Sequence, residues 1–282
     1  MLQDLQAGRL ENEFCNICAG SQDTVLCFHQ GNVLLCREAD DALSLPVLSE
    51  VQGWETAAQP RYLFRMQERN FFLWTDAAPA APKGCFAYEP VRQLRQLRSK
   101  DVCFAIMTGW HLYNWYRNNR LCGCCGAPTV HDSKERMLRC PACGNMIFPR
   151  ISPAVIVAVT NGDRLLLSKY AGRAYTRYAL LAGYTEIGET IEQTVHREVI
   201  EEVGLRVKNL RYYKSQPWGV DGNVLMGFYC DVDGSDAIHI DENELSMADW
   251  YPRDDLPAKD DGISLTREMI RVFGEGKEPK GV

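Results

Sequence analysis

The segment from Gly183 to Leu205, GYTEIGETIEQTVHREVIEEVGL, constrains the fold more than any other part of the chain. Its Glu198, Glu201 and Glu202 stand at i, i+3 and i+4, offsets that bring side chains to one face of a helix. Carboxylates at these spacings repel one another unless a positive charge lies between them. A hard cation with oxygen ligands, Mg²⁺ or Mn²⁺, would supply that charge. The segment therefore predicts a short helix that carries a divalent-metal site.

The fixed positions of this segment resemble the signature of the Nudix hydrolases. The matching residues are Gly183, Glu189, Arg197, Glu198, Val199, Glu201, Glu202, Gly204 and Leu205. The resemblance implies a loop–helix–loop in which Arg197 pairs with Glu189 and the three later glutamates bind metal. Gly183, Gly188 and Gly204 are expected at turns, because glycine adopts positive φ without steric cost. The alternative is a solvated acidic helix face, as most charge runs are.

Length and composition narrow the class of protein. The 282 residues suffice for about two domains with a sizeable core. The N-terminus lacks a basic start followed by an apolar stretch, and no apolar run approaches the ~18 residues that span a bilayer. We therefore expect a cytoplasmic protein with no membrane role. A net charge of −6 argues against broad, sequence-blind nucleic-acid binding but is compatible with a small anionic ligand neutralised by metal.

Four of the twelve cysteines have the spacing of a zinc site. Cys122-x-x-Cys125 and Cys140-x-x-Cys143 form two pairs separated by fourteen residues, and a glycine follows each pair. Four thiolates close a tetrahedral site and leave no open position for catalysis, so the pattern predicts structural Zn²⁺ rather than chance cysteine pairs. We interpret Cys124 as an extra thiol and His131 as a surface residue rather than a fifth donor.

The other cysteines are expected to be reduced, because disulfides are uncommon in a longer chain without a secretion signal. Cys15 and Cys18 have no second pair at a matching distance, so we interpret them as ordinary thiols near the terminus rather than a metal or redox site. The remaining five lie among apolar residues and are predicted to be small core side chains: Cys27, Cys36, Cys85, Cys103 and Cys230.

Apolar alternation and turn residues predict the order of elements. Hairpin-like strand pairs are expected at 24–28 with 32–36, 62–66 with 70–74, and 153–160 with 164–170, and further strands at 210–218 and 225–232. Val91, Leu94 and Leu97 recur at helical spacing, a second helix follows Asp101, and a final helix spans about 265–273. The segment 76–84 has the composition of a linker.

These features predict an α/β protein of three domains. Residues 1–118 would form an N-terminal α+β domain, 119–149 a zinc ribbon, and 150–282 a Nudix domain with the α/β/α sandwich that the resemblance implies. A zinc ribbon directly before a Nudix domain resembles the NADH pyrophosphatase family over nearly the whole chain. The segment 115–126, WYRNNRLCGCCG, and the motif opening Ser215-Gln216-Pro217-Trp218 support that resemblance, whereas 219–223 read GVDGN in place of the usual Pro-Phe-Pro-x-Ser.

The resemblance implies roles for residues outside the acidic helix. Gln216 and Trp218 belong to the motif that marks substrate preference. Phe148 and Tyr184 fall where aromatic rings clamp a base, Phe148 reaching from the partner subunit of a homodimer. Taken alone, both rings would be interpreted as ordinary core aromatics. Glu244 falls at an additional metal-binding or catalytic carboxylate, and Thr266 falls beside the substrate pocket.

The predicted activity is hydrolysis of the pyrophosphate bond of NAD(H) to AMP and a nicotinamide mononucleotide. Glu198, Glu201 and Glu202 would bind the metal, and either Glu202 or Glu244 would orient or deprotonate the attacking water. The resemblance also implies removal of NAD caps from RNA 5′ ends. The alternatives are hydrolysis of another nucleoside diphosphate derivative, such as ADP-ribose or diadenosine polyphosphate, or a nucleic-acid-binding regulator whose Nudix domain senses a ligand. The intact acidic box favours an enzyme.

Overall fold

The computed structural model describes residues 1–5, 8–37, 43–51, 60–74, 84–96, 99–172, 176–257 and 260–280. It divides into two compact units. Unit 1 contains Met1, Ile151–Pro217 and Asn223–Val282, and unit 2 contains Leu2–Arg150 and Trp218–Gly222. The predicted zinc ribbon shares unit 2 with the predicted N-terminal domain, and the division into three domains stays a prediction. Apart from Gly84, the predicted linker at 76–84 lies outside the described residues.

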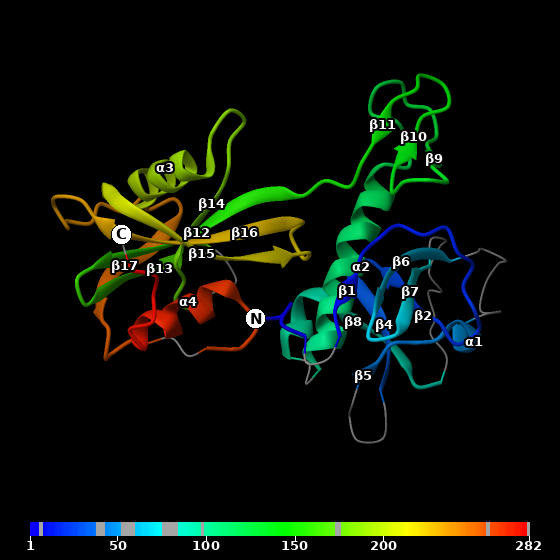
Figure 1. Ribbon diagram of the computed structural model, residues 1–282, viewed down its shortest axis with the longest axis horizontal. Coiled ribbons are helices and arrows are strands. Elements are labelled where there is room, and N and C mark those ends of the chain that lie inside the picture. The colour runs from blue at the N-terminus through cyan, green and yellow to red at the C-terminus, as the bar shows by residue number, and fades with distance from the viewer. Residues whose placement is uncertain are drawn as a thin grey trace. The chain divides into compact units, whose positions relative to one another are not determined.

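Unit 1 is built on a six-stranded mixed sheet (Figure 1) with the strand order β15-β16-β12-β13-β17 and with β14 also paired to β12. The strands are β12 (Ser152–Asn161), β13 (Arg164–Tyr170), β14 (Leu181–Tyr184), β15 (Val207–Trp218), β16 (Asn223–Val232) and β17 (Leu245–Pro252). The central strand β12 is parallel to β16 and antiparallel to β13 and β14. The four strands that the sequence predicts in this region are confirmed. The near-continuous apolar run in β12 arises because both faces of the sheet are covered.

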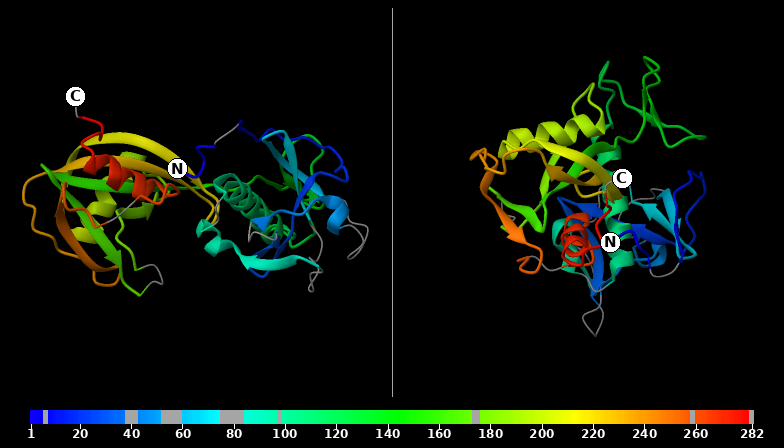
Figure 2. Two further views of the ribbon diagram at one scale, coloured as in Figure 1. Left: turned by 90° about the horizontal axis from the view of Figure 1, so that it is seen from below. Right: turned by 60° about the vertical axis from the view of Figure 1, so that its left-hand side comes forward.

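Two helices cover opposite faces of this sheet, α3 (Ile191–Val203) and α4 (Leu265–Gly274) (Figures 1 and 2). Alternate residues of β12 face the two helices. Val155 and Val157 pack in one core with three valines of α3, whereas Ile156 packs in the other core with α4. The valines of α3 are Val195, Val199 and Val203, and the buried residues of α4 include Leu265, Met269 and Phe273. The predicted α/β/α sandwich and the predicted final helix are confirmed.

Both ends of α3 are set by local sequence. At the start, Thr190 and Gln193 form a capping box, in which the Thr190 hydroxyl accepts a hydrogen bond from Gln193 N and the Gln193 side chain accepts one from Thr190 N. At the end, Gly204 adopts a left-handed conformation with φ of 70°. Gly188, in the loop before the helix, has φ of 96°. The predicted turns at Gly188 and Gly204 are therefore confirmed.

Unit 2 contains two small four-stranded sheets and a three-stranded sheet. The first has the order β1-β6-β7-β2, and the second has the order β3-β4-β5 with β8 paired to β4. Their strands are β1 (Leu10–Glu11), β2 (Thr24–Leu26), β3 (Phe28–His29), β4 (Asn32–Arg37), β5 (Leu43–Ser44), β6 (Arg61–Met66), β7 (Arg69–Leu73) and β8 (Phe86–Pro90). The third sheet contains β9 (Val130–His131), β10 (Leu138–Arg139) and β11 (Met146–Ile147).

The predicted hairpin at 62–66 and 70–74 is confirmed as β6 and β7, but the strand predicted at 24–28 is divided between two sheets. β2 pairs parallel with β7 and β3 pairs antiparallel with β4, so the chain changes sheets at Cys27. The divided strand could not be predicted because a continuous apolar run does not reveal which neighbour each half will pair with.

The helices of unit 2 are α1 (Leu48–Val51), the 3₁₀ helix η1 (Val91–Gln96) and α2 (Lys100–Asn118). Ser99 caps α2 by accepting a hydrogen bond from Val102 N at 3.4 Å, so the predicted second helix is confirmed and begins at Lys100. η1 covers Val91 and Leu94 of the predicted helical spacing, whereas Leu97 lies outside the described residues. Within the described residues, no helix is long and apolar enough to cross a membrane.

Cys36 and Cys85 are joined by a disulfide, with their Cα atoms 5.1 Å apart. The prediction that both are free core thiols is therefore wrong. In the antiparallel pairing of β4 with β8, Cys36 lies opposite Phe86, the residue next to Cys85. This register brings the two sulfurs together. Closing a loop of this length stabilises the folded chain by about 4 kcal/mol in the chain-entropy model. Cys27, Cys103 and Cys230 are buried and are not disulfide-bonded, as predicted.

We expect thiol counting to reveal this bond. Denatured, zinc-free protein purified without reductant should expose ten reactive thiols, the number of free cysteines, and twelve after reduction. Cys36→Ser should give the same count before and after reduction, because Cys85 then has no partner. Twelve thiols in the unreduced wild-type protein would contradict the bond.

Candidate functional site

The acidic helix α3 directs two of its three predicted metal ligands toward strand β14. Glu198 is 8% exposed and Glu202 is 2% exposed. Ala182 N donates a hydrogen bond to Glu202 Oε1 at 3.3 Å, and the carboxylate of Glu198 lies over Gly183. Glu201 is exposed on the same helix. The alternative of a wholly solvated acidic face is therefore excluded for Glu198 and Glu202.

Gly183 does not form a turn, so that part of the sequence prediction is wrong. It lies inside β14, paired with Val155, and is not among the glycines with positive φ. A Cβ atom at this position would stand 1.8 Å from Cδ of Glu198. The absence of a side chain therefore leaves the space that the Glu198 carboxylate occupies.

We expect Gly183→Ala to lower kcat/KM for the reaction proposed below by about 10²-fold, the effect of misplacing a reacting group by about 1 Å. The added methyl group would force the Glu198 carboxylate away from β14. Steady-state kinetics would measure the loss. Gly20→Ala is the matched control, because its Cβ would lie 3.5 Å from the nearest atom at an ordinary φ. Wild-type kcat/KM in Gly183→Ala would contradict the placement of Glu198.

Arg197 binds three carboxylates and one backbone carbonyl. Its Nε and Nη2 donate to the two oxygens of Glu189 at 2.6 and 2.9 Å, so the predicted pair is confirmed. Nη1 donates to Glu198 at 2.7 Å and to Glu201 at 2.9 Å, and Nη2 also donates to Tyr184 O at 2.8 Å. The Arg197 hydrogen bonds, with the backbone N–H of Glu186, hold the pKa of Glu189 at about 2. Arg197 thus ties the loop before α3 to the helix and to β14.

Burial raises the pKa of Glu198, and the negative charges of Glu201 and Glu244 raise it further, although Arg197 opposes this shift. Glu244 therefore lies close enough to act on the Glu198 carboxylate. It is exposed, in a turn where Glu244 N donates to Asp241 O, and its own C=O accepts from Ala171 N at 2.8 Å. The turn that carries Glu244 therefore lies within electrostatic range of the acidic helix.

These residues fit a divalent cation. All the donors are carboxylate oxygens, the ligands that hard cations prefer, and their mutual repulsion would be relieved by positive charge. Within the described part of the chain, the side chains that lie close enough together to hold a metal ion are the four cysteines of the zinc ribbon, and that group includes no carboxylate. Arg197 instead binds one oxygen of Glu198 and one of Glu201. Glu198, Glu201, Glu202 and Glu244 are the residues that could hold the ion.

The predicted substrate residues differ in their surroundings. Tyr184 is 51% exposed and Thr266, at the start of α4, is partly exposed.

Gln216 is fully buried. Its side-chain amide donates a hydrogen bond to Ile263 O and accepts one from Leu265 N, both at 2.7 Å. Trp218 is buried and its indole N–H donates to Asp221 at 3.2 Å. Gln216 therefore holds the start of α4, and direct substrate contacts of Gln216 and Trp218 stay predictions.

Adjacent residues of β14 face opposite sides of the sheet. Gly183 faces α3, as its approach to Glu198 shows. Tyr184 shares a face with Ala182, which packs in the core that contains Leu265 of α4. The ring predicted to contact the base and the carboxylates predicted to hold metal thus lie on opposite faces beside one strand.

Asn223, which no sequence motif marks as a site residue, accepts a hydrogen bond from the Tyr184 hydroxyl at 3.1 Å. The two residues are 39 positions apart in different strands. The only sequence signal at Asn223 is its place at the end of the altered segment 219–223. No local pattern could have linked it to Tyr184.

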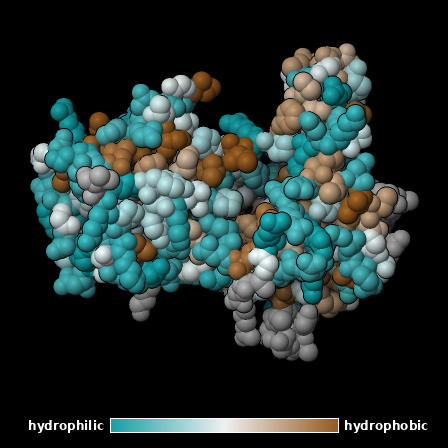
Figure 3. Space-filling view, viewed as in Figure 1, coloured by the Kyte–Doolittle hydropathy of each residue, from teal (hydrophilic) through white to brown (hydrophobic). Residues whose placement is uncertain are grey.

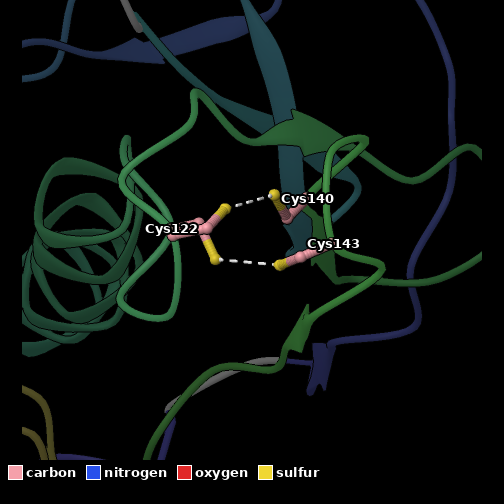
Figure 4. Close-up of side chains that lie close together, drawn as sticks. Cys122, Cys140 and Cys143 are labelled. Atoms are coloured by element: carbon pink, nitrogen blue, oxygen red, sulfur yellow. Dashed lines mark hydrogen bonds between the residues drawn. The ribbon is translucent and has the colours of Figure 1, made fainter.

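The four predicted zinc ligands come together as expected, and Figure 4 labels three of them, Cys122, Cys140 and Cys143. The Sγ atoms of Cys122, Cys125, Cys140 and Cys143 all lie within 4.8 Å of one another. Cys122 and Cys143 are 3.6 Å apart and Cys125 and Cys140 are 3.5 Å apart, close to the ~3.8 Å edge of a tetrahedron with Zn–S bonds of about 2.3 Å. The cluster fits structural Zn²⁺.

His131 is not the surface residue that the sequence predicts. Its ring is half-buried, packs at a tilt against Phe14, stacks on Tyr116, and makes a 2.8 Å hydrogen bond to the Tyr116 hydroxyl. Burial lowers the pKa of His131. It therefore packs the zinc ribbon against α2. Cys15, Cys18 and Cys124 are exposed and free, as predicted.

Comparison with known proteins agrees with this geometry. Residues 150–273 match the NUDIX domain, and residues 117–148 match the NADH pyrophosphatase zinc ribbon domain. A protein named NAD-capped RNA hydrolase NudC from Stutzerimonas stutzeri is 34% identical over 260 residues, covering 90% of each chain. The proteins of the same name from Pseudomonas syringae pv. tomato and Pectobacterium atrosepticum are 35% and 38% identical. The match to the Pseudomonas protein covers 82% of this chain and 79% of the relative, and the match to the Pectobacterium protein covers 63% of this chain and 68% of the relative. The chain therefore belongs to the family of Nudix hydrolases that carry an NADH pyrophosphatase zinc ribbon.

Proposed function

We propose that this protein hydrolyses the pyrophosphate bond of NAD(H), giving AMP and a nicotinamide mononucleotide, and removes NAD caps from RNA 5′ ends. The observation that carries the proposal is the placement of Glu198 and Glu202, buried against β14, while Arg197 holds Glu189. The relatives named NAD-capped RNA hydrolase support the choice of substrate. Water adds to one phosphorus, the bridging P–O bond breaks, and each product leaves with a phosphate group.

The four carboxylates have different tasks in this proposal. Glu198, Glu201 and Glu202 hold Mg²⁺ or Mn²⁺, with Glu244 as an additional ligand. When bound, such an ion neutralises phosphate oxygens and lowers the pKa of the attacking water. Either Glu202 or Glu244 orients that water or accepts its proton. Glu202 is buried and fixed by Ala182 N, whereas Glu244 lies on an exposed turn, so the two differ in their freedom to reach the water.

The protein is proposed to act as a homodimer in which Phe148 of one subunit contacts the base bound by its partner. The support is the surface of the zinc ribbon. Its exposed apolar residues are Leu121, Val130, Met146 and Phe148. In Figure 3 this part of the chain, at the upper right, shows light brown patches beside teal ones. Phe148 itself is 53% exposed directly after β11. Clustered exposed apolar residues of this kind commonly mark a protein interface.

A substrate panel tests the proposed activity. The protein is incubated with NADH, NAD⁺, ADP-ribose and diadenosine polyphosphate, with Mg²⁺ or with Mn²⁺, and the nucleotides are separated by chromatography. AMP and a nicotinamide mononucleotide should form fastest from NADH or NAD⁺. Faster cleavage of ADP-ribose or diadenosine polyphosphate would instead favour the second candidate, for which the altered segment 219–223 is the sequence evidence.

RNA carrying a 5′ NAD cap provides the second arm of this experiment. Decapping should leave a 5′-monophosphate and release nicotinamide mononucleotide. Nucleic-acid binding that weakens steeply with salt, without hydrolysis of any substrate, would favour a regulator and overturn the proposed enzyme.

A further inference from the structure

Tyr184 is held at both ends although half of its surface is exposed. Its hydroxyl donates to Asn223 Oδ1 at 3.1 Å, and its backbone C=O accepts from Arg197 Nη2 at 2.8 Å. Asn223 is only 8% exposed, at the first position of β16, so the acceptor is itself fixed. An exposed tyrosine without such a bond would sample several rotamers. Here the ring is tethered to β16 through its hydroxyl, and the backbone of the same residue is bonded to the arginine that binds the carboxylates of α3.

The strand register shows how the hydrogen bond forms. Tyr184 of β14 lies opposite Ala154 of β12, while Asn223 of β16 lies opposite Ser152, two residues earlier in β12. Because β12 lies between β14 and β16, the side chains of Tyr184 and Asn223 must both extend over β12 for the hydroxyl to meet Oδ1. Ala154, the residue next to Tyr184 in the sheet, has a side chain small enough to leave that path open.

We infer that Asn223 is a positioning residue, which holds the ring of Tyr184 ready to stack on a planar base of the substrate. The inference rests on the proposed function and adds to it a residue that sets substrate affinity. A tyrosine already fixed in its bound rotamer loses less side-chain entropy when a ligand binds. Because Asn223 acts through Tyr184 and lies on the α4 face of the sheet, its loss affects KM and leaves kcat unchanged.

A double-mutant cycle tests this inference with the full-length enzyme. Tyr184→Phe keeps the ring and removes the donor, and Asn223→Leu removes the acceptor at similar volume. Each variant should raise KM for NADH about fivefold, the effect of losing one hydrogen bond, with kcat within about twofold of the wild-type value. The double variant should have the KM of either single variant, because both remove the same bond. Tyr212→Phe is the matched control, since Tyr212 is a similarly exposed tyrosine of unit 1, and its KM should not change.

A KM that rises about 25-fold in the double variant would show independent roles and overturn the inference. An unchanged KM in Tyr184→Phe would also overturn it, and this arm remains informative if Asn223→Leu fails to fold. The same cycle is measured without turnover by calorimetry, with AMP and with nicotinamide mononucleotide as probes. If the double variant loses no more probe affinity than either single variant, the positioning role is supported. If the wild-type protein hydrolyses no dinucleotide in the same experiment, the proposed function alone is contradicted. If neither probe binds the wild-type protein, the positioning role is contradicted.

Discussion

Replacing Glu202 by glutamine should lower kcat for dinucleotide hydrolysis by about 10³-fold or more, equivalent to about 4 kcal/mol of transition-state stabilisation. The substitution removes one negative charge from the carboxylates proposed to hold the metal, and removes one of the two groups that could accept a proton from water. The measurement is single-turnover hydrolysis of NADH at saturating Mg²⁺ or Mn²⁺.

The fold should survive this substitution. The glutamine carbonyl can still accept the hydrogen bond from Ala182 N, and an uncharged amide is less costly to bury than a carboxylate. Tm should therefore shift by no more than about 3 °C. Glu192→Gln is the matched control, because Glu192 is exposed in the first turn of the same helix and should retain wild-type kcat. An active Glu202→Gln variant would remove Glu202 from the mechanism.

Removing zinc should unfold the ribbon formed by β9, β10 and β11. Each of these strands contains only two residues, and the apolar residues buried between them are few, among them Met137 and Leu138. Such a small module depends on its metal, and structural zinc supplies about 10–16 kcal/mol in zinc-finger peptides. Hydrogen exchange after chelation should therefore show loss of protection from about residue 121 to 147.

The sheet of unit 1 provides the internal comparison, because its two cores contain none of the four cysteine ligands and its amides should stay protected. Cys140→Ser should reproduce the effect of chelation and should lower the zinc content measured by emission spectroscopy. Cys124→Ser is the control, since Cys124 is exposed and outside the four-sulfur cluster, and it should retain one zinc ion per chain. A ribbon that keeps its protection without metal would contradict a structural role for zinc.

Features encoded by short-range spacing could be predicted from the sequence. The box from Gly183 to Leu205 specified α3, the pair of Arg197 with Glu189, and the glycine turns at 188 and 204, because helical offsets and capping residues act within a few positions. The two Cys-x-x-Cys pairs specified their cluster for the same reason. Apolar alternation also located the strands of unit 1, since each face of the sheet meets a helix.

Features that depend on distant pairing could not be predicted. Gly183 leaves room for the carboxylate of Glu198, which stands fifteen residues later on α3 and points back toward β14. Gln216 bonds to residues 47 and 49 positions away, and Cys36 bonds to Cys85 across 49 positions. His131 was predicted at the surface because nothing local shows that Phe14 and Tyr116 will cover it. In each case the partner is selected by the register of strands or the packing of a helix, which composition and periodicity do not report.

The alternation of side chains along β14 has a consequence for engineering the enzyme. Gly183 must stay without a side chain so that Glu198 keeps its place, but the next residue projects from the other face. The link from residue 184 to Arg197 uses a backbone carbonyl, which any amino acid supplies. A library randomised at 184 and 223 could therefore search for new base preferences while the carboxylates proposed to act in hydrolysis, on the α3 side, are left as they are.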